Sequence, residues 1–164
     1  MGAAATVVPA IADMVAELVA EVGAENVTIM GDSAGGTITL AVAMRLRDRG
    51  LPAPHGTILI SPALDLALTD PAIARIAPRD PWLAAAGPRA VAQLWRGELP
   101  LDDPLVSPLH GDLSGLAPII LFSGTRDIFN ADARSLAQSQ GGRLPPGLSR
   151  GARDAARLPA AADP

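Results

Sequence analysis

A serine set among small residues carries the strongest chemical signal in this sequence. Residues 31–36 read Gly-Asp-Ser-Ala-Gly-Gly, after the apolar run 27–30 and before a helical stretch that begins near Thr37. In such a strand–turn–helix, a tight bend lifts the serine hydroxyl above the sheet, where it can attack a carbonyl carbon. Ser33 is the predicted nucleophile, and the backbone N–H of Ala34 is the predicted oxyanion donor. The alternative is a glycine-rich turn with no chemistry.

The bend also makes a steric demand on its flanking residues. Small residues are expected on both sides of Ser33, because a Cβ atom there would clash with the neighbouring backbone. Gly31, Gly35 and Gly36 fit this expectation.

A serine hydroxyl needs a base, usually a histidine that a carboxylate orients. Asp127 lies a few residues beyond the third predicted strand, where the acid of such a site belongs, and it is the predicted acid. Its alternative is a loop carboxylate paired with Arg126. Asp65, beyond the second strand, is the second candidate acid, although a loop or helix-start carboxylate is the favoured interpretation. Asp132 is the predicted cap of the following helix.

No catalytic histidine is found. The sequence holds two histidines, His55 and His110, and both precede Asp127, against the expected order of serine, acid and histidine. Both are expected at the end of the sheet opposite Ser33, so each is interpreted as a surface-loop histidine. Neither has the neighbours of a metal ligand, and no metal is predicted.

The periodicity of apolar residues predicts the elements that must position these groups. Apolar spacing of three and four residues favours helices, and short apolar runs bounded by Gly and Pro favour buried strands. The predicted elements are helices over 9–22, 37–47, 88–95 and 132–140 and strands over 26–30, 57–60 and 118–123. This alternation predicts an α/β domain with a parallel sheet over residues 1–140. The Gly/Ala/Pro/Arg-rich tail, 141–164, shows no strand pattern and is interpreted as disordered.

Composition excludes several classes of protein. With a net charge of −4 and no basic run, nucleic-acid binding is not expected. The chain has no cysteine, which fits a reducing, cytoplasmic location, and no apolar run long enough to span a bilayer. Phosphate or dinucleotide binding at the Ser33 turn is disfavoured, because a G-x-G-x-x-G motif and a P-loop lysine are lacking.

The chain resembles the hormone-sensitive-lipase branch of the α/β-hydrolases, a group of esterases and lipases. The resemblance rests on the 31–36 turn with the helix end 44–50, on 59–62 with Asp65, on 103–108 followed by 113–116, and on 123–127 with 132–134. It implies a partial α/β-hydrolase fold, a three-layer sandwich with a mostly parallel sheet of about three strands. It also implies hydrolysis of small-molecule carboxylic esters without a cofactor, with Ser33 as nucleophile, Asp127 as acid and the Ala34 amide at the oxyanion.

Two departures from that family shape the expected function. The His-Gly-Gly-Gly loop before the serine and the histidine after the last helix are both missing, and their absence favours a fragment of an esterase that is inactive or crippled. The alternative is a non-catalytic α/β-hydrolase-like protein that binds a ligand or a partner.

Overall fold

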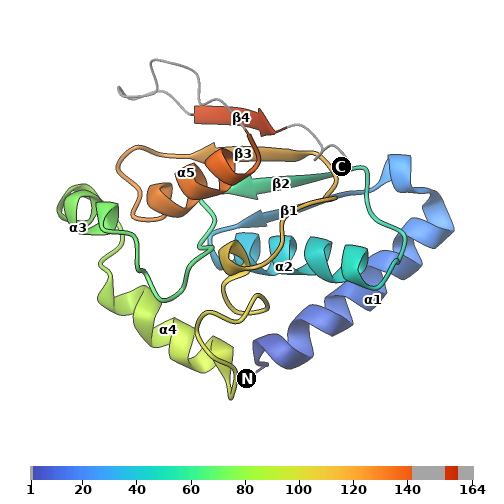
Figure 1. Cartoon of the computed structure of the whole chain (residues 1–164), viewed down its shortest axis with the longest axis horizontal. Coiled ribbons are helices and arrows are strands. Elements are labelled where there is room, and N and C mark those ends of the chain that lie inside the picture. The colour runs from blue at the N-terminus through green and yellow to red at the C-terminus, as the bar shows by residue number, and fades with distance from the viewer. Residues whose placement is uncertain (1, 142–153, 159–164) are drawn as a thin grey trace.

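Three short parallel strands form most of the sheet. In the computed structural model, which describes residues 2–141 and 154–158, β1 (Thr28–Asp32) pairs with β2 (Gly56–Ile60), which pairs with β3 (Ile119–Ser123) (Figure 1). The register sets Asp32 beside Ile60 and Ile60 beside Phe122, so the three strands end at one edge. The predicted α/β class, with a parallel sheet of about three strands, is confirmed.

Helices pack on the sheet and extend beyond it. The helices are α1 (Ala4–Val22), α2 (Ala34–Asp48), α3 (Ala72–Ile76), α4 (Ala86–Arg96) and α5 (Asn130–Ser139), with 3-10 turns η1 (Ala24–Asn26), η2 (Ala77–Arg79) and η3 (Pro108–His110). The helix α2 packs on β1 and β2, α5 packs on β3, and α1 packs on α2. In Figure 1, α3 and α4 lie to one side of the sheet, beyond the ends of the parallel strands. No helix of the described residues is both long and apolar enough to cross a bilayer.

The main core lies between one face of the sheet and the helices α2 and α5. Leu59 and Leu121 are neighbours across β2 and β3, and they pack with Leu40 of α2 and Leu136 of α5. Alternate strand residues point to the other face. On that face Met30 of β1 is 65% exposed. One face of the sheet therefore carries the buried residues of β2 and β3, and the other face is only partly buried.

All four predicted helices begin earlier than expected, α4 and α5 by two residues and α1 and α2 by more. α1 starts at Ala4, with Pro9 inside it, because Ala4 is fully buried against the cluster that includes residues of α4, and this packing extends the helix upstream of the proline. Pro9 is the sixth residue of α1, beyond the first four N–H groups that lack intrahelical acceptors, so its ring removes one backbone hydrogen bond of the helix. α2 starts at Ala34, directly after Ser33, and not at Thr37.

The sequence pattern predicts no strand after residue 140, and for residues 154–158 this prediction is wrong. β4 (Asp154–Leu158) pairs antiparallel with β3. An edge strand is recruited through main-chain hydrogen bonds, which do not require an alternating apolar pattern. The rest of the tail, residues 142–153 and 159–164, lies outside the described residues.

Asp132 does not cap a helix, and this sequence prediction is also wrong. It lies inside α5, where its Oδ2 accepts hydrogen bonds from the N–H groups of Leu64 (2.7 Å) and Asp65 (2.9 Å). The carboxyl group thus fixes the start of α5 to the loop after β2. The side chain is 1% exposed, and its Oδ1 has no partner among the described residues.

Burial makes the Asp132 carboxyl group a weaker acid than an exposed aspartate. Loss of water, together with the negative charges of Asp65 and Asp70, raises the pKa of Asp132 from 3.8 to about 7, although the two N–H groups lower it. Between pH 4 and pH 7 the folded chain therefore holds a proton that the unfolded chain has lost. Folding stability falls as the pH rises through this interval, because ionisation of this carboxyl group stabilises the unfolded chain alone.

We expect Asp132→Asn to remove most of that pH dependence. The asparagine oxygen can accept the same two N–H groups and cannot ionise. The wild-type chain should lose up to about 4 kcal/mol of unfolding free energy between pH 4.5 and pH 8 from this group, and the variant should not. Urea unfolding at both pH values measures the difference, with Asp102→Asn as an exposed control. Parallel curves for the wild type and Asp132→Asn would contradict the assignment.

Candidate active site

The Ser33 turn is held in a conformation that few side chains adopt. Its φ of 54° and ψ of −118° lie outside the helical and strand regions. The Ser33 N–H donates to the Ile60 carbonyl of β2 (2.9 Å), and its carbonyl accepts from the N–H groups of Gly36 (3.0 Å) and Ala63 (3.2 Å). Hydrogen bonds to the neighbouring strand therefore stabilise the strained conformation of Ser33. The serine is half-buried and lines a pocket.

The glycines around Ser33 are not equivalent. A Cβ on Gly31 would collide with the Gly35 backbone and the Thr39 side chain, and one on Gly36 would lie 2.6 Å from Cβ of Pro62. At Gly35 a Cβ would meet nothing within 4 Å. The sequence prediction that all flanking positions must be small is confirmed at Gly31 and Gly36 and wrong at Gly35, because the space beside Gly35 is open.

The Ala34 N–H stands at the first position of α2, a helix of 15 residues. The first N–H groups of a helix have no intrahelical acceptor, and the helix dipole favours negative charge beside them. Ala34 and Ser33 line the same apolar pocket. This arrangement can stabilise an oxyanion that forms at the carbon attacked by Ser33 Oγ.

Asp127 lies in the turn between β3 and α5 and lines a second pocket together with Ser33. Its Oδ1 accepts the N–H of Phe129 at 2.9 Å, and its Oδ2 is buried without a hydrogen-bond partner among the described residues. None of the ion pairs within residues 2–141 joins Asp127 to Arg126. The Asp127 carboxyl group thus lies on the same pocket as Ser33, with one of its oxygens held by the turn backbone.

Burial raises the pKa of the Asp127 carboxyl. The Ser61 hydroxyl lies near the carboxyl group without a hydrogen bond of normal geometry, and it lowers the pKa in part together with the Phe129 N–H. The negative charges of Asp80 and Asp32 raise the pKa further. A cationic or N–H-bearing group beside Oδ2 would reverse this effect, because it favours the charged form of the carboxyl group.

Two cavities meet at Ser33. The first, about 540 Å³, is the more polar of the two and is called the polar cavity; it lies on the Asp127 side, where Asp32, Asp80 and Arg126 also line it. The second, about 520 Å³, is apolar and lies beneath α4, between Ala34 and Trp95. Ser33, Trp82, Leu83 and Phe129 line both cavities. A ligand centred on Ser33 can therefore extend a polar part to one side and an apolar part to the other.

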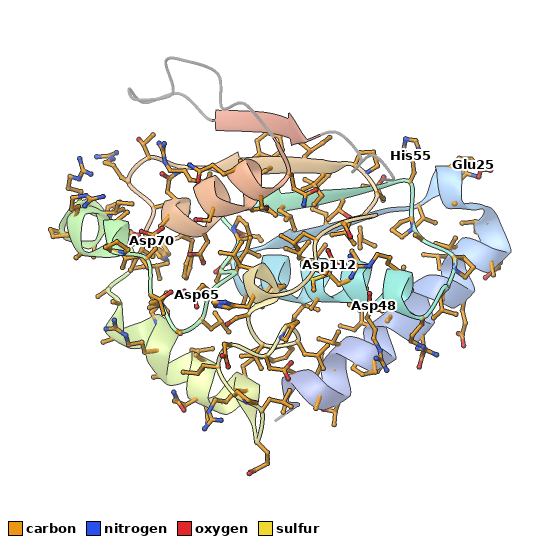
Figure 2. The ribbon with its side chains drawn as sticks, in the orientation of Figure 1. Glu25, Asp48, His55, Asp65, Asp70 and Asp112 are labelled. Carbon is orange, nitrogen blue, oxygen red and sulfur yellow. The ribbon has the colours of Figure 1, made fainter. Side chains whose placement is uncertain are left out.

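Neither histidine lines these cavities. His55 precedes β2, at the end of the sheet opposite Ser33, and it is exposed, as predicted (Figure 2). His110, at the end of η3, is also exposed, as predicted, and its Nε2 lies 3.2 Å from Oδ1 of Asp65.

Asp65 is a buried loop carboxylate, as the sequence favours, and it lies outside both cavities. It accepts the N–H groups of Ala67 (3.0 Å) and Thr69 (2.9 Å). Burial raises the pKa of Asp65, but hydrogen bonds from Thr69, His110 and Ala67 outweigh this effect and hold the pKa below its usual value.

Sequence reasoning missed the residues that enclose the site from the 61–118 segment. Ser61, Asp80, Trp82 and Leu83 all line the polar cavity. The only local signal was an aspartate before Pro81, which is typical of many turns. Within residues 2–141, no group of three His, Asp or Glu side chains is placed to hold a metal ion.

The chain belongs to the α/β-hydrolase fold family, whose model matches residues 3–142. It is 39% identical over 126 residues to a triacylglycerol lipase of Mycobacterium tuberculosis, covering 77% of this chain and 24% of that protein. It is 37% identical over 114 residues to an acetyl-hydrolase of Streptomyces hygroscopicus, covering 70% of this chain and 38% of that protein.

Solved structures place the chain beside the hormone-sensitive-lipase branch. A homologue of hormone-sensitive lipase from a metagenome library superposes with a TM-score of 0.77 at 31% identity, over 82% of this chain and 47% of that one. The predicted resemblance is confirmed. The chain spans less than half the length of these relatives.

Alanine substitutions of Gly31, Gly35 and Gly36 should show at which of these positions the packing requires a glycine. We expect Gly31→Ala and Gly36→Ala to destabilise the chain by about 1–3 kcal/mol, because each Cβ is forced into an occupied space. Gly35→Ala should leave stability unchanged or raise it by up to about 1 kcal/mol, since alanine favours a helix. Thermal unfolding of the three variants measures this order, and equal losses at all three positions would contradict it.

Proposed function

We propose that this chain carries the nucleophile and the acid of a serine ester hydrolase. Ser33 is the nucleophile, Asp127 the acid and the Ala34 N–H one oxyanion donor. The observation that supports this assignment best is that Ser33 and Asp127, from the turns after β1 and β3, line the same cavity. Relatives named lipase, acetyl-hydrolase and esterase favour carboxylic esters as substrates.

In the proposed reaction Ser33 Oγ attacks the ester carbonyl carbon while an imidazole takes the hydroxyl proton. The same imidazole then protonates the leaving alcohol, so the alcohol must face the side where Asp127 orients the imidazole. That side is the polar cavity, and the acyl group accordingly enters the apolar cavity beside Ala34. The proposed substrate is a small-molecule ester with an apolar acyl group.

The 164-residue chain does not bring its own histidine to this position, since neither His55 nor His110 lines the cavity. Loss of the histidine from such a triad reduces turnover on the order of 10⁶-fold. We therefore propose that this chain alone hydrolyses esters at a negligible rate.

Free imidazole should restore part of the missing chemistry. We expect release of p-nitrophenol from p-nitrophenyl acetate to rise with imidazole concentration above the rate of imidazole alone, because imidazole can hydrogen-bond Asp127 Oδ2 and accept the Ser33 proton. Ser33→Ala should abolish this component, and Asp127→Asn should lower it about tenfold or more.

Two results would contradict the proposal in different ways. Equal imidazole-dependent rates in the wild type and Ser33→Ala would exclude Ser33 as the nucleophile. A clear Ser33-dependent rate without imidazole would show that the chain supplies its own base.

The apolar cavity also supports a second candidate function, ligand binding without turnover. The sequence has two tryptophans, Trp82 and Trp95, and both line this cavity, so tryptophan fluorescence reports its occupancy. Val91 lines the cavity too and is 57% exposed, whereas Leu94, on the same helix and 60% exposed, does not line it.

We expect 1-octanol to change the tryptophan emission saturably. Val91→Glu should weaken binding about tenfold or more, because the alkyl group of the octanol would then contact a charged side chain that must stay hydrated. Leu94→Glu should bind like the wild type. Equal affinity in Val91→Glu and Leu94→Glu would place the ligand elsewhere.

A further inference from the structure

Asp80 joins two segments that are distant in the sequence. It lies between η2 and α4, and its Oδ1 accepts the N–H groups of Trp82 (2.8 Å) and Leu83 (2.9 Å). Its Oδ2 accepts the N–H of Ile128 at 2.8 Å. Ile128 follows Asp127 directly, so one carboxyl group contacts both the acid-bearing turn and the wall of the two cavities.

The Asp80 carboxyl is charged at neutral pH. Burial raises its pKa, but the N–H groups of Leu83, Trp82 and Ile128 outweigh burial and hold the pKa below its usual value. Hydrogen bonds to a charged acceptor are stronger than neutral ones. The hydrogen bonds that Asp80 accepts from Ile128 and from the Trp82–Leu83 backbone therefore persist over the pH range in which the Asp127 carboxyl is ionised.

Packing alone does not fix the backbone at Trp82. Ile128 is fully buried, and Leu83 packs against the same apolar cluster, but the side chain of Trp82 is 90% exposed. The backbone at Trp82 is held through Asp80 and not through burial of its own side chain. Because Trp82 and Leu83 line both cavities with Ser33, their position sets the distance between the cavity wall and the acid.

We propose that Asp80 is a positioning residue, which holds the turn that carries Asp127 against the Trp82–Leu83 wall of the site. The inference rests on the function proposed above for Asp127. Asp80 contacts neither the nucleophile nor the reacting atoms in this role, and it acts through the backbone of Ile128.

The variants Asp80→Ala, Asp80→Asn and Asp70→Ala test this role. Asp70 is a matched control, because it is also half-buried, its Oδ1 accepts the N–H of Ala72 at 2.7 Å at the start of α3, and it lines neither cavity. NMR on the full chain reports hydrogen exchange at the Ile128, Trp82 and Leu83 amides and the titration of the Asp127 carboxyl carbon. Imidazole-dependent turnover is measured in parallel.

We expect Asp80→Ala to speed exchange at all three amides by about ten- to a hundredfold. Asp80→Asn keeps one acceptor oxygen and should preserve the hydrogen bonds to one of the two segments, so its protection should be intermediate. Both variants should lower the titration midpoint of Asp127, because a nearby negative charge is removed while Asp32 and Arg126 remain. Asp70→Ala should leave the Ile128 amide and the Asp127 midpoint unchanged.

Unchanged Ile128 exchange in Asp80→Ala overturns the inference, whatever happens to turnover. Equal effects of Asp70→Ala and Asp80→Ala overturn it too, because they would show general loosening of the 61–118 segment. If no variant, the wild type included, shows Ser33-dependent turnover, the proposed hydrolase function fails, and the exchange and titration data still decide whether Asp80 positions Asp127.

Discussion

The parallel pairing of β1, β2 and β3 is the constraint on which the rest of the structure depends. Because the three strands run the same way in register, the turns that follow them meet at one edge of the sheet. The turn after β1 carries Ser33, and the turn after β3 carries Asp127. The Ser33 N–H bonds to β2 itself, so the strained turn is anchored by the sheet that brings it to the acid.

Asp127 and Asp132, near the start of α5, are half-buried and buried, and their carboxyl groups have different surroundings. The Oδ2 of Asp132 is occupied by two backbone N–H groups, which fix the helix to the loop after β2. Asp127 makes one such bond, from the Phe129 N–H, and its residue lines the cavity that Ser33 also lines. In both cases burial raises the pKa, but only Asp127 lies beside a cavity.

The site lies where the sheet meets the 61–118 segment, and each part contributes something different. The sheet and α2 hold the residues of the proposed chemistry, Ser33, Ala34 and Asp127. The segment supplies the walls, with Trp82, Leu83 and Trp95 around the cavities. Asp80 and Asp132 are polar links between the parts, whereas the apolar contacts around Ile128 and Phe129 provide the packing.

The sequence by itself determined the α/β class, the Ser33 turn and the position of Asp127. These features follow from local rules: the period of apolar residues, the steric demand of a tight bend, and the rule that polar groups follow the ends of parallel strands. Local patterns also placed His55 at the far end of the sheet.

Only the tertiary structure decided the partners of the remaining groups. The Asp132 carboxyl group accepts a hydrogen bond from the Leu64 N–H, and the Asp80 carboxyl group accepts one from the Ile128 N–H. The His110 ring lies within hydrogen-bond distance of Asp65. Such hydrogen bonds join segments far apart in the sequence, and an aspartate suited to a local cap is equally suited to a distant amide. The open space at Gly35 was hidden for the same reason, because what a Cβ would meet there depends on how the other elements pack.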